Sequence, residues 1–158
     1  MNIGIIVYSR TGNTLSVAER VRDAVAAQGH TAVIERITAE NEDPNNKLPV
    51  RLKTVPDPAQ YDAVIFGAPV QGFSLSPIMA AYGAQLPELA GKQAGCFVTQ
   101  HFPKPWMGGS RAISQMRKLL RSKGAIIAET GIVNWTSKAR EDQISGLADR
   151  FLTVGEAT

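Results

Sequence analysis

The sequence contains a single cysteine, Cys96, among its 158 residues. One thiol excludes a disulfide within the chain and most zinc sites, and it fits a reducing compartment, so we expect a cytoplasmic protein. Because Cys96 lies in an apolar, strand-like run, we interpret it as a buried structural thiol rather than a nucleophile. No cluster of His, Asp, Glu and Cys has metal-ligand spacing, so no metal site is predicted.

The sequence also lacks an apolar run long enough to span a membrane, and its first residues resemble a strand rather than a secretory leader. The net charge is only +3, and the Lys and Arg residues are spread along the chain. Nucleic-acid binding usually requires clustered cations with interleaved aromatics, so no nucleic-acid partner is expected. The small positive excess better suits the docking of an acidic protein partner.

What the chain does contain is an alternation of strand and helix patterns. Apolar, strand-like runs occupy residues 2–8, 31–37, 61–68, 93–99 and 125–133. Helical periodicity follows at 13–28, 77–86, 110–123 and around 144–151, with Ser110 expected to cap the third helix. This order predicts one α/β domain over residues 1–158, a three-layer sandwich in which right-handed crossovers connect a five-stranded parallel sheet.

Residues 40–60 interrupt the alternation. They hold four prolines together with Asn, Asp and Lys, and they show no sustained hydrophobic period. We interpret them as a long surface connection, with a short helix or extended piece near residues 50–54. A solvated linker is the simpler interpretation, and a partner-binding loop is the alternative.

The segment from Ser9 to Thr14 joins the first strand to the first helix. Its members are small, hydroxylated or flexible, namely Ser9, Arg10, Thr11, Gly12, Asn13 and Thr14. Unpaired N–H groups and the positive dipole end at a helix start bind phosphate, and the hydroxyls add donors. An ordinary turn with a helix cap is the alternative reading.

Three other protein classes with alternating strands and helices are excluded, because this chain lacks the residues that each of them requires. A response-regulator receiver needs carboxylates after the first and third strands, where this chain has Tyr8-Ser9 and Ala68-Pro69. No GxxxxGK[ST] motif is present, which excludes a P-loop NTPase. A cysteine phosphatase needs Arg six residues after its Cys, and that position is Phe102.

The pattern Ser-x-Thr-Gly-Asn-Thr after the first strand resembles the phosphate loop of the flavodoxin family, whose members bind flavin mononucleotide (FMN). The resemblance extends over most of the chain and implies strand order 2-1-3-4-5. The uninterrupted fifth strand is similar to that of the short-chain type. Arg10 fills the variable position of the loop, where its charge either reaches the phosphate or lies in solvent.

The second candidate loop follows the third strand and resembles the family pattern Gly-x-Pro-Val-x-Gly. The resemblance places its residues beside the flavin ring, namely Pro69, Val70, Gln71, Gly72 and Phe73. Gly72 would supply the peptide that faces N5, because glycine tolerates the required backbone conformation. Gln71 stands where many electron-carrying flavodoxins have an aromatic residue, and Phe73 would pack near the dimethylbenzene edge instead. A plain tight turn is the alternative.

The third candidate loop follows the fourth strand and matches the family in position but not in residue pattern. Its candidates are Thr99, Gln100, His101, Phe102, Trp106, Gly108 and Gly109. Thr99 and Gln100 would hydrogen-bond the N3, O2 or O4 edge, and Phe102 or Trp106 would stack on the ring or else plug the sheet edge. His101 would stabilise the anionic reduced flavin, unless it is a solvated loop residue.

The resemblance implies an electron carrier that binds FMN non-covalently and serves redox partner proteins, with no catalytic residue of its own; the positive net charge favours acidic partners. Since flavodoxins usually surround the flavin with acidic residues, this basic chain is expected to have a less negative reduction potential. The alternative is an FMN-dependent reductase that takes hydride from NAD(P)H and passes it to a quinone or a flavin. A flavin-free interaction module is the third possibility, and the sequence does not predict the oligomeric state.

Overall fold

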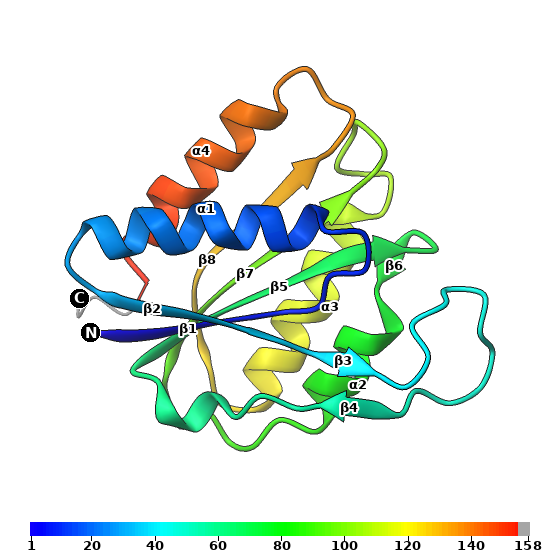
Figure 1. Cartoon of the computed structure of the whole chain (residues 1–158), viewed down its shortest axis with the longest axis horizontal. Helices are drawn as coiled ribbons and strands as arrows, with labels where there is room; N and C mark the ends of the chain where they lie inside the picture. The colour runs from blue at the N-terminus through cyan, green and yellow to red at the C-terminus, as the bar shows by residue number, and fades with distance from the viewer. Residues whose placement is uncertain (155–158) are drawn as a thin grey trace.

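A parallel sheet forms the centre of the computed structural model, which describes residues 1–154; the last four residues of the expected domain lie outside the described residues (Figure 1). Its strands are β1 (Asn2–Val7), β2 (Thr31–Arg36), β5 (Ala63–Gln71), β7 (Gln93–Gln100) and β8 (Ile126–Asn134). They are ordered β2-β1-β5-β7-β8, and each neighbouring pair is parallel. The predicted strand order is therefore confirmed.

Helices cover both faces of this sheet. α1 (Asn13–Ala27) and α4 (Arg140–Phe151) lie on one face, while α2 (Pro77–Ala84) and α3 (Gly109–Ser122) lie on the other (Figure 1). β1 contributes Ile3 and Ile5 to the core under α1 and α4, and Ile6 to the core under α2 and α3. Burial on both faces explains why the strands have unbroken apolar sequences.

The connection over residues 40–60 is more ordered than a solvated linker. β3 (Thr38–Ala39) pairs antiparallel with β4 (Leu52–Thr54), and the 3-10 helix η1 (Pro58–Gln60) follows. The extended piece expected near residues 50–54 is therefore present as β4. Between β3 and β4 the chain forms a loop that projects beyond the sheet (Figure 1).

β5 is longer than the sequence pattern predicts, because it continues past Ala68 to Gln71. It then folds back as β6 (Ser74–Leu75), which pairs antiparallel with the end of β5. The two turn residues, Gly72 and Phe73, both have φ 60°, the left-handed conformation that two-residue hairpins require. The expected loop over residues 69–76 is therefore mostly a hairpin.

The predicted cap of α3 is wrong. The cap position is Gly108, with φ 116°, and Ser110 lies inside the helix with its N–H donating to the carbonyl of Pro105 at 2.9 Å. A Cβ atom at Gly108 would lie 2.8 Å from Cα of Phe73, so the hairpin packs against the start of α3 at this glycine. Among residues 1–154, no helix combines the length and apolarity needed to cross a membrane.

Replacing Gly67 by Ala tests how closely the sheet packs. A Cβ atom at Gly67 would lie 2.2 Å from the buried ring of Phe97, so we expect overpacking to lower the free energy of unfolding by about 1–3 kcal/mol. The control is Gly146→Ala in α4, where a Cβ meets only the guanidinium of Arg150, at 3.6 Å, and where we expect a gain of about 0.5–1 kcal/mol. Urea unfolding measures both; equal stabilities would contradict the packing argument.

Candidate functional site

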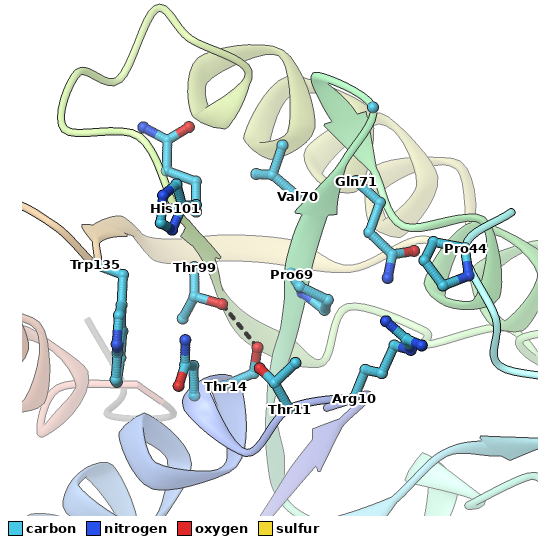
Figure 2. Close-up of a pocket in the computed structure, with 13 residues that line it drawn as sticks. Arg10, Thr11, Thr14, Pro44, Pro69, Val70, Gln71, Thr99, His101 and Trp135 are labelled. Atoms are coloured by element: carbon cyan, nitrogen blue, oxygen red, sulfur yellow. Dashed lines mark hydrogen bonds between the residues drawn. The ribbon is translucent and has the colours of Figure 1, made fainter.

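A cavity of about 370 Å³ lies at the edge of the sheet where the parallel strands end. Its wall includes eleven of the predicted site residues, from all three candidate loops: Arg10, Thr11, Asn13, Thr14, Pro69, Val70, Gln71, Gly72, Thr99, Gln100 and His101. Figure 2 shows Arg10, Gln71 and Pro44 at one end, and His101 and Trp135 at the other. In parallel α/β sheets ligands bind at this edge, where the strand order reverses.

The first loop leaves hydrogen-bond donors at the start of α1. The hydroxyl of the buried Ser9 accepts from the N–H of Leu15 at 3.1 Å, and Gly12, with φ 99°, occupies the cap position. Within residues 1–154, no hydrogen bond uses the N–H of Gly12, Asn13 or Thr14. These free donors and the positive end of the helix dipole favour an anion.

A hydrogen bond connects the first and third loops below the cavity. The hydroxyls of Thr14 and Thr99 lie 2.7 Å apart, and both side chains are buried (Figure 2). In this pair one hydroxyl donates and the other accepts, so each has a partner within the protein. It therefore fixes the start of α1 against the end of β7.

The second loop is fixed by α3. The side-chain oxygen of Gln115 accepts hydrogen bonds from the hydroxyl of Ser74 at 3.0 Å and from the N–H of Leu75 at 2.8 Å. Both donors belong to β6, so Gln115 positions the hairpin that presents Gln71 and Gly72 to the cavity.

Gln100 lines the cavity and also stabilises the third loop through its side-chain amide. Its Nε2 donates to the carbonyl of Lys104 at 2.6 Å and to Oδ1 of Asn134, and its Oε1 is buried without a partner among the described residues. Its backbone carbonyl accepts from the N–H of Trp135 at 2.7 Å. Gln100 thus joins the third loop to the residues that follow β8.

Seven predicted residues lie outside the cavity wall. They are Ser9, Gly12, Phe73, Phe102, Trp106, Gly108 and Gly109. The aromatic rings of Phe73 and Phe102 stack on each other instead, with centroids 5.6 Å apart and planes 3° from parallel. Trp106 is 76% exposed.

The aromatic residue that does line the cavity is Trp135, which was not predicted. The guanidinium carbon of Arg140 lies 4.6 Å from the centre of its ring, and the same guanidinium donates to the carbonyl of Trp135 at 3.0 Å. Pro44, from the loop between β3 and β4, is the second unpredicted lining residue. Trp135 follows the end of β8 at the same sheet edge, a signal that sequence analysis overlooked, whereas no local pattern marks Pro44.

The cavity wall has a positive charge balance. Arg10 lines it, and no Asp or Glu does. Tyr8, whose hydroxyl is buried, interacts with Arg10 and Gln71 of the cavity wall. Burial, followed by the nearby charge of Glu42, raises the pKa of the Tyr8 hydroxyl, so this group stays neutral.

Neither a nucleophilic thiol nor a metal centre accompanies the cavity. Burial raises the pKa of the Cys96 thiol to about 12, which leaves almost no reactive thiolate at neutral pH. In the part of the chain that the structure describes, no group of three or more His, Cys, Asp and Glu side chains could hold a metal ion.

No family model and no curated protein matches the sequence, but many solved structures match the fold. Two-electron-reduced flavodoxin from Megasphaera elsdenii has a TM-score of 0.70 at 23% identity, covering 96% of this chain and 98% of that one. Oxidised flavodoxin 2 from Bacillus cereus has a TM-score of 0.68 at 20% identity, and the match covers 96% of this chain and 97% of that one. A short-chain flavodoxin associated with a bacterial microcompartment has a TM-score of 0.69 at 14% identity, and the match covers 97% of each chain.

The similarity extends along nearly the full length of these flavodoxins, and the strand order is the one that the phosphate-loop motif implied. Together, the sheet, its two helical layers and these neighbours show that the chain has the flavodoxin-like fold.

Proposed function

We propose that the cavity binds one FMN non-covalently and that the protein carries electrons between partner proteins. The observation that supports this most directly is the group of free N–H donors at Gly12, Asn13 and Thr14, which opens into a cavity without carboxylates. An anionic group bound there gains hydrogen bonds and the helix dipole without repulsion. FMN carries its phosphate at one end of the molecule, as this arrangement requires.

The remainder of the cavity suits a planar, largely apolar group. Pro69, Val70 and the Trp135 ring line it, and its volume of about 370 Å³ lies within the ordinary range of small-molecule sites. Thr11 and Gln71 add polar side chains to its wall. When bound, FMN supplies the redox chemistry, and the chain supplies binding, orientation and charge.

The similarity to flavodoxins extends this proposal from binding to electron transfer. The neighbours named above are flavodoxins, two of them described as oxidised or two-electron reduced. We assign the protein to a reducing compartment such as the cytoplasm, where Cys96 stays a free thiol.

Replacing Thr11 by Val tests the phosphate end of the site. Thr11 lines the cavity, is exposed and makes no hydrogen bond to another described residue, so its loss should leave the fold unchanged. A hydrogen bond to a charged acceptor is worth about 1.5–3 kcal/mol, so we expect the Kd for FMN to rise roughly tenfold or more. Quenching of flavin fluorescence measures it.

Riboflavin, which lacks the phosphate, is the ligand control for this substitution, and Thr31→Val on the exposed edge of β2 is the protein control. Thr11→Val should leave the Kd for riboflavin unchanged. Thr31→Val should leave the Kd for FMN and the Kd for riboflavin unchanged. If FMN fails to bind the wild-type protein, the proposed function is wrong.

Arg10→Gln tests the charge of the site. Arg10 is the charged residue on a cavity wall without carboxylates, so it favours a flavin that has gained electrons. We expect the substitution to lower the reduction potential of the bound flavin by on the order of tens of millivolts. Anaerobic potentiometric titration measures the shift, with Lys53→Gln, on exposed β4, as the control. An unchanged potential would mean that Arg10 lies in solvent away from the flavin.

One observation favours an NAD(P)H-dependent reductase as the second candidate: Phe73, Phe102 and Trp106 all lie outside the cavity wall, so none of them covers the cavity. Stopped-flow mixing of FMN-loaded protein with NADH or NADPH separates the two functions. A carrier should be reduced slowly, below roughly 0.1 s⁻¹, whereas a reductase should approach the median enzymatic rate of about 10 s⁻¹. A fast reaction would replace the carrier assignment by the reductase assignment.

A further inference from the structure

Three exposed aromatic residues belong to the two loops that border the cavity, and we call them the aromatic rim: Phe73, Phe102 and Trp106. Their exposed fractions are 57%, 40% and 76%. Phe73 adjoins Gly72 and Phe102 adjoins His101, and both of these neighbours line the cavity. Adjacent large exposed aromatics of this kind mark interaction surfaces rather than ordinary solvent-exposed chain.

Two members of the aromatic rim, Phe73 and Phe102, are held in place by the fold. Phe73 has φ 60°, a conformation that is unfavourable for a bulky side chain and that persists here within the β5–β6 hairpin. Its ring stacks on that of Phe102, and Gly108 packs against its backbone. A rigid aromatic surface loses little conformational entropy when a partner covers it.

The part of the sequence that contains the aromatic rim also has a positive net charge. Residues 63–128 hold seven Lys and Arg and a single carboxylate, Glu88, giving a net charge of +6. The remaining residues hold ten Lys and Arg and thirteen Asp and Glu, giving −3. The positive segment contains α2 and α3, which share one face of the sheet (Figure 1).

Two cations of α3 extend from the aromatic rim along the helix. Arg111 lies four residues before Gln115 and Lys118 three residues after it, so all three share one side of the helix. Gln115 contacts β6, which places this side of α3 along the hairpin that carries Phe73. Arg111 and Lys118 are exposed, and within residues 1–154 neither forms an ion pair.

The same side of α3 borders an apolar groove of about 380 Å³ between α2 and α3. Leu75, Ala80 and Leu119 line it, together with Gln115 and Lys118. Leu75 follows Phe73 by two residues, so the groove continues the apolar surface of the hairpin. The surface therefore has an apolar centre and cations at its edge.

We propose that the aromatic rim, with Arg111 and Lys118, is the docking surface for an acidic electron-transfer protein. The partner class rests on the proposed function, because the rim borders the cavity assigned to FMN. The cations would attract carboxylates on the partner and orient its approach, since charge complementarity raises association rates. The aromatic rim would then exclude water at the centre of the contact.

Binding of a fluorescently labelled acidic [2Fe–2S] ferredoxin, followed by anisotropy at low ionic strength, tests the proposal. We expect Arg111→Glu and Trp106→Ala each to raise the Kd about fivefold to tenfold. Lys53→Glu makes the same charge inversion on exposed β4, and Leu48→Ala truncates a side chain that is 73% exposed in the loop between β3 and β4. Both controls should stay within about twofold of the wild-type protein.

Added salt should weaken ferredoxin binding, and a labelled basic cytochrome c should bind at least tenfold more weakly. Equal effects of Arg111→Glu and Lys53→Glu would overturn the proposal, because they would show only a response to net charge. Binding of the cytochrome as tight as that of ferredoxin would also overturn it. Since the aromatic rim lies outside the cavity, the anisotropy is measured with and without FMN. A protein that does not bind FMN contradicts the proposed function, whereas a protein that binds FMN but not ferredoxin contradicts only the docking proposal.

Two other occupants are tested with the same variants. If a 20-base-pair DNA duplex binds more tightly than ferredoxin and loses affinity with Arg111→Glu, the surface belongs to nucleic acid and the proposal is wrong. If sedimentation velocity shows a dimer that Trp106→Ala dissociates, a second copy of the chain covers the aromatic rim, and the proposal is likewise wrong.

Discussion

The hydrogen bond between Thr14 and Thr99 connects two segments that are 85 residues apart and joins the start of α1 to the end of β7. The cavity depends on this connection, because one side of it comes from the first loop and the other from the third. The parallel sheet makes the contact possible by bringing both strand ends to one edge. The free N–H donors at the start of α1 and the loop after β7 are therefore held together within the protein itself, without a ligand.

The loops are each supported by side chains from other parts of the chain. Gln115 of α3 holds the hairpin, and Gln100 connects its own loop to Asn134 at the end of β8. The second connection uses buried polar groups, which are costly when unpaired and therefore favour one arrangement. Such support reduces the ordering that ligand binding would otherwise require.

The sequence alone predicted the sheet and most of the cavity wall because both depend on local patterns. Buried parallel strands produce apolar runs, and the residues that follow them reach one edge whatever the loop conformations are. It did not predict the β5–β6 hairpin or the cap of α3, which depend on the contact between Phe73 and Gly108. Pro44 reaches the cavity through the loop between β3 and β4, whose path the sequence pattern does not specify.

The aromatic residues show most clearly that sequence patterns do not specify tertiary contacts. Phe102 and Trp106 were predicted from their loop, yet Trp135 is the one that lines the cavity. Loop sequence indicates which residue types are available, whereas the direction of each ring depends on its tertiary contacts, such as Arg140 over Trp135 or Phe73 against Phe102. The cavity therefore has an aromatic wall at its Trp135 end, while the exposed stacked pair faces solvent beside the mouth. Which aromatic lines the cavity and which are exposed beside it therefore follows from the packing and not from the sequence pattern.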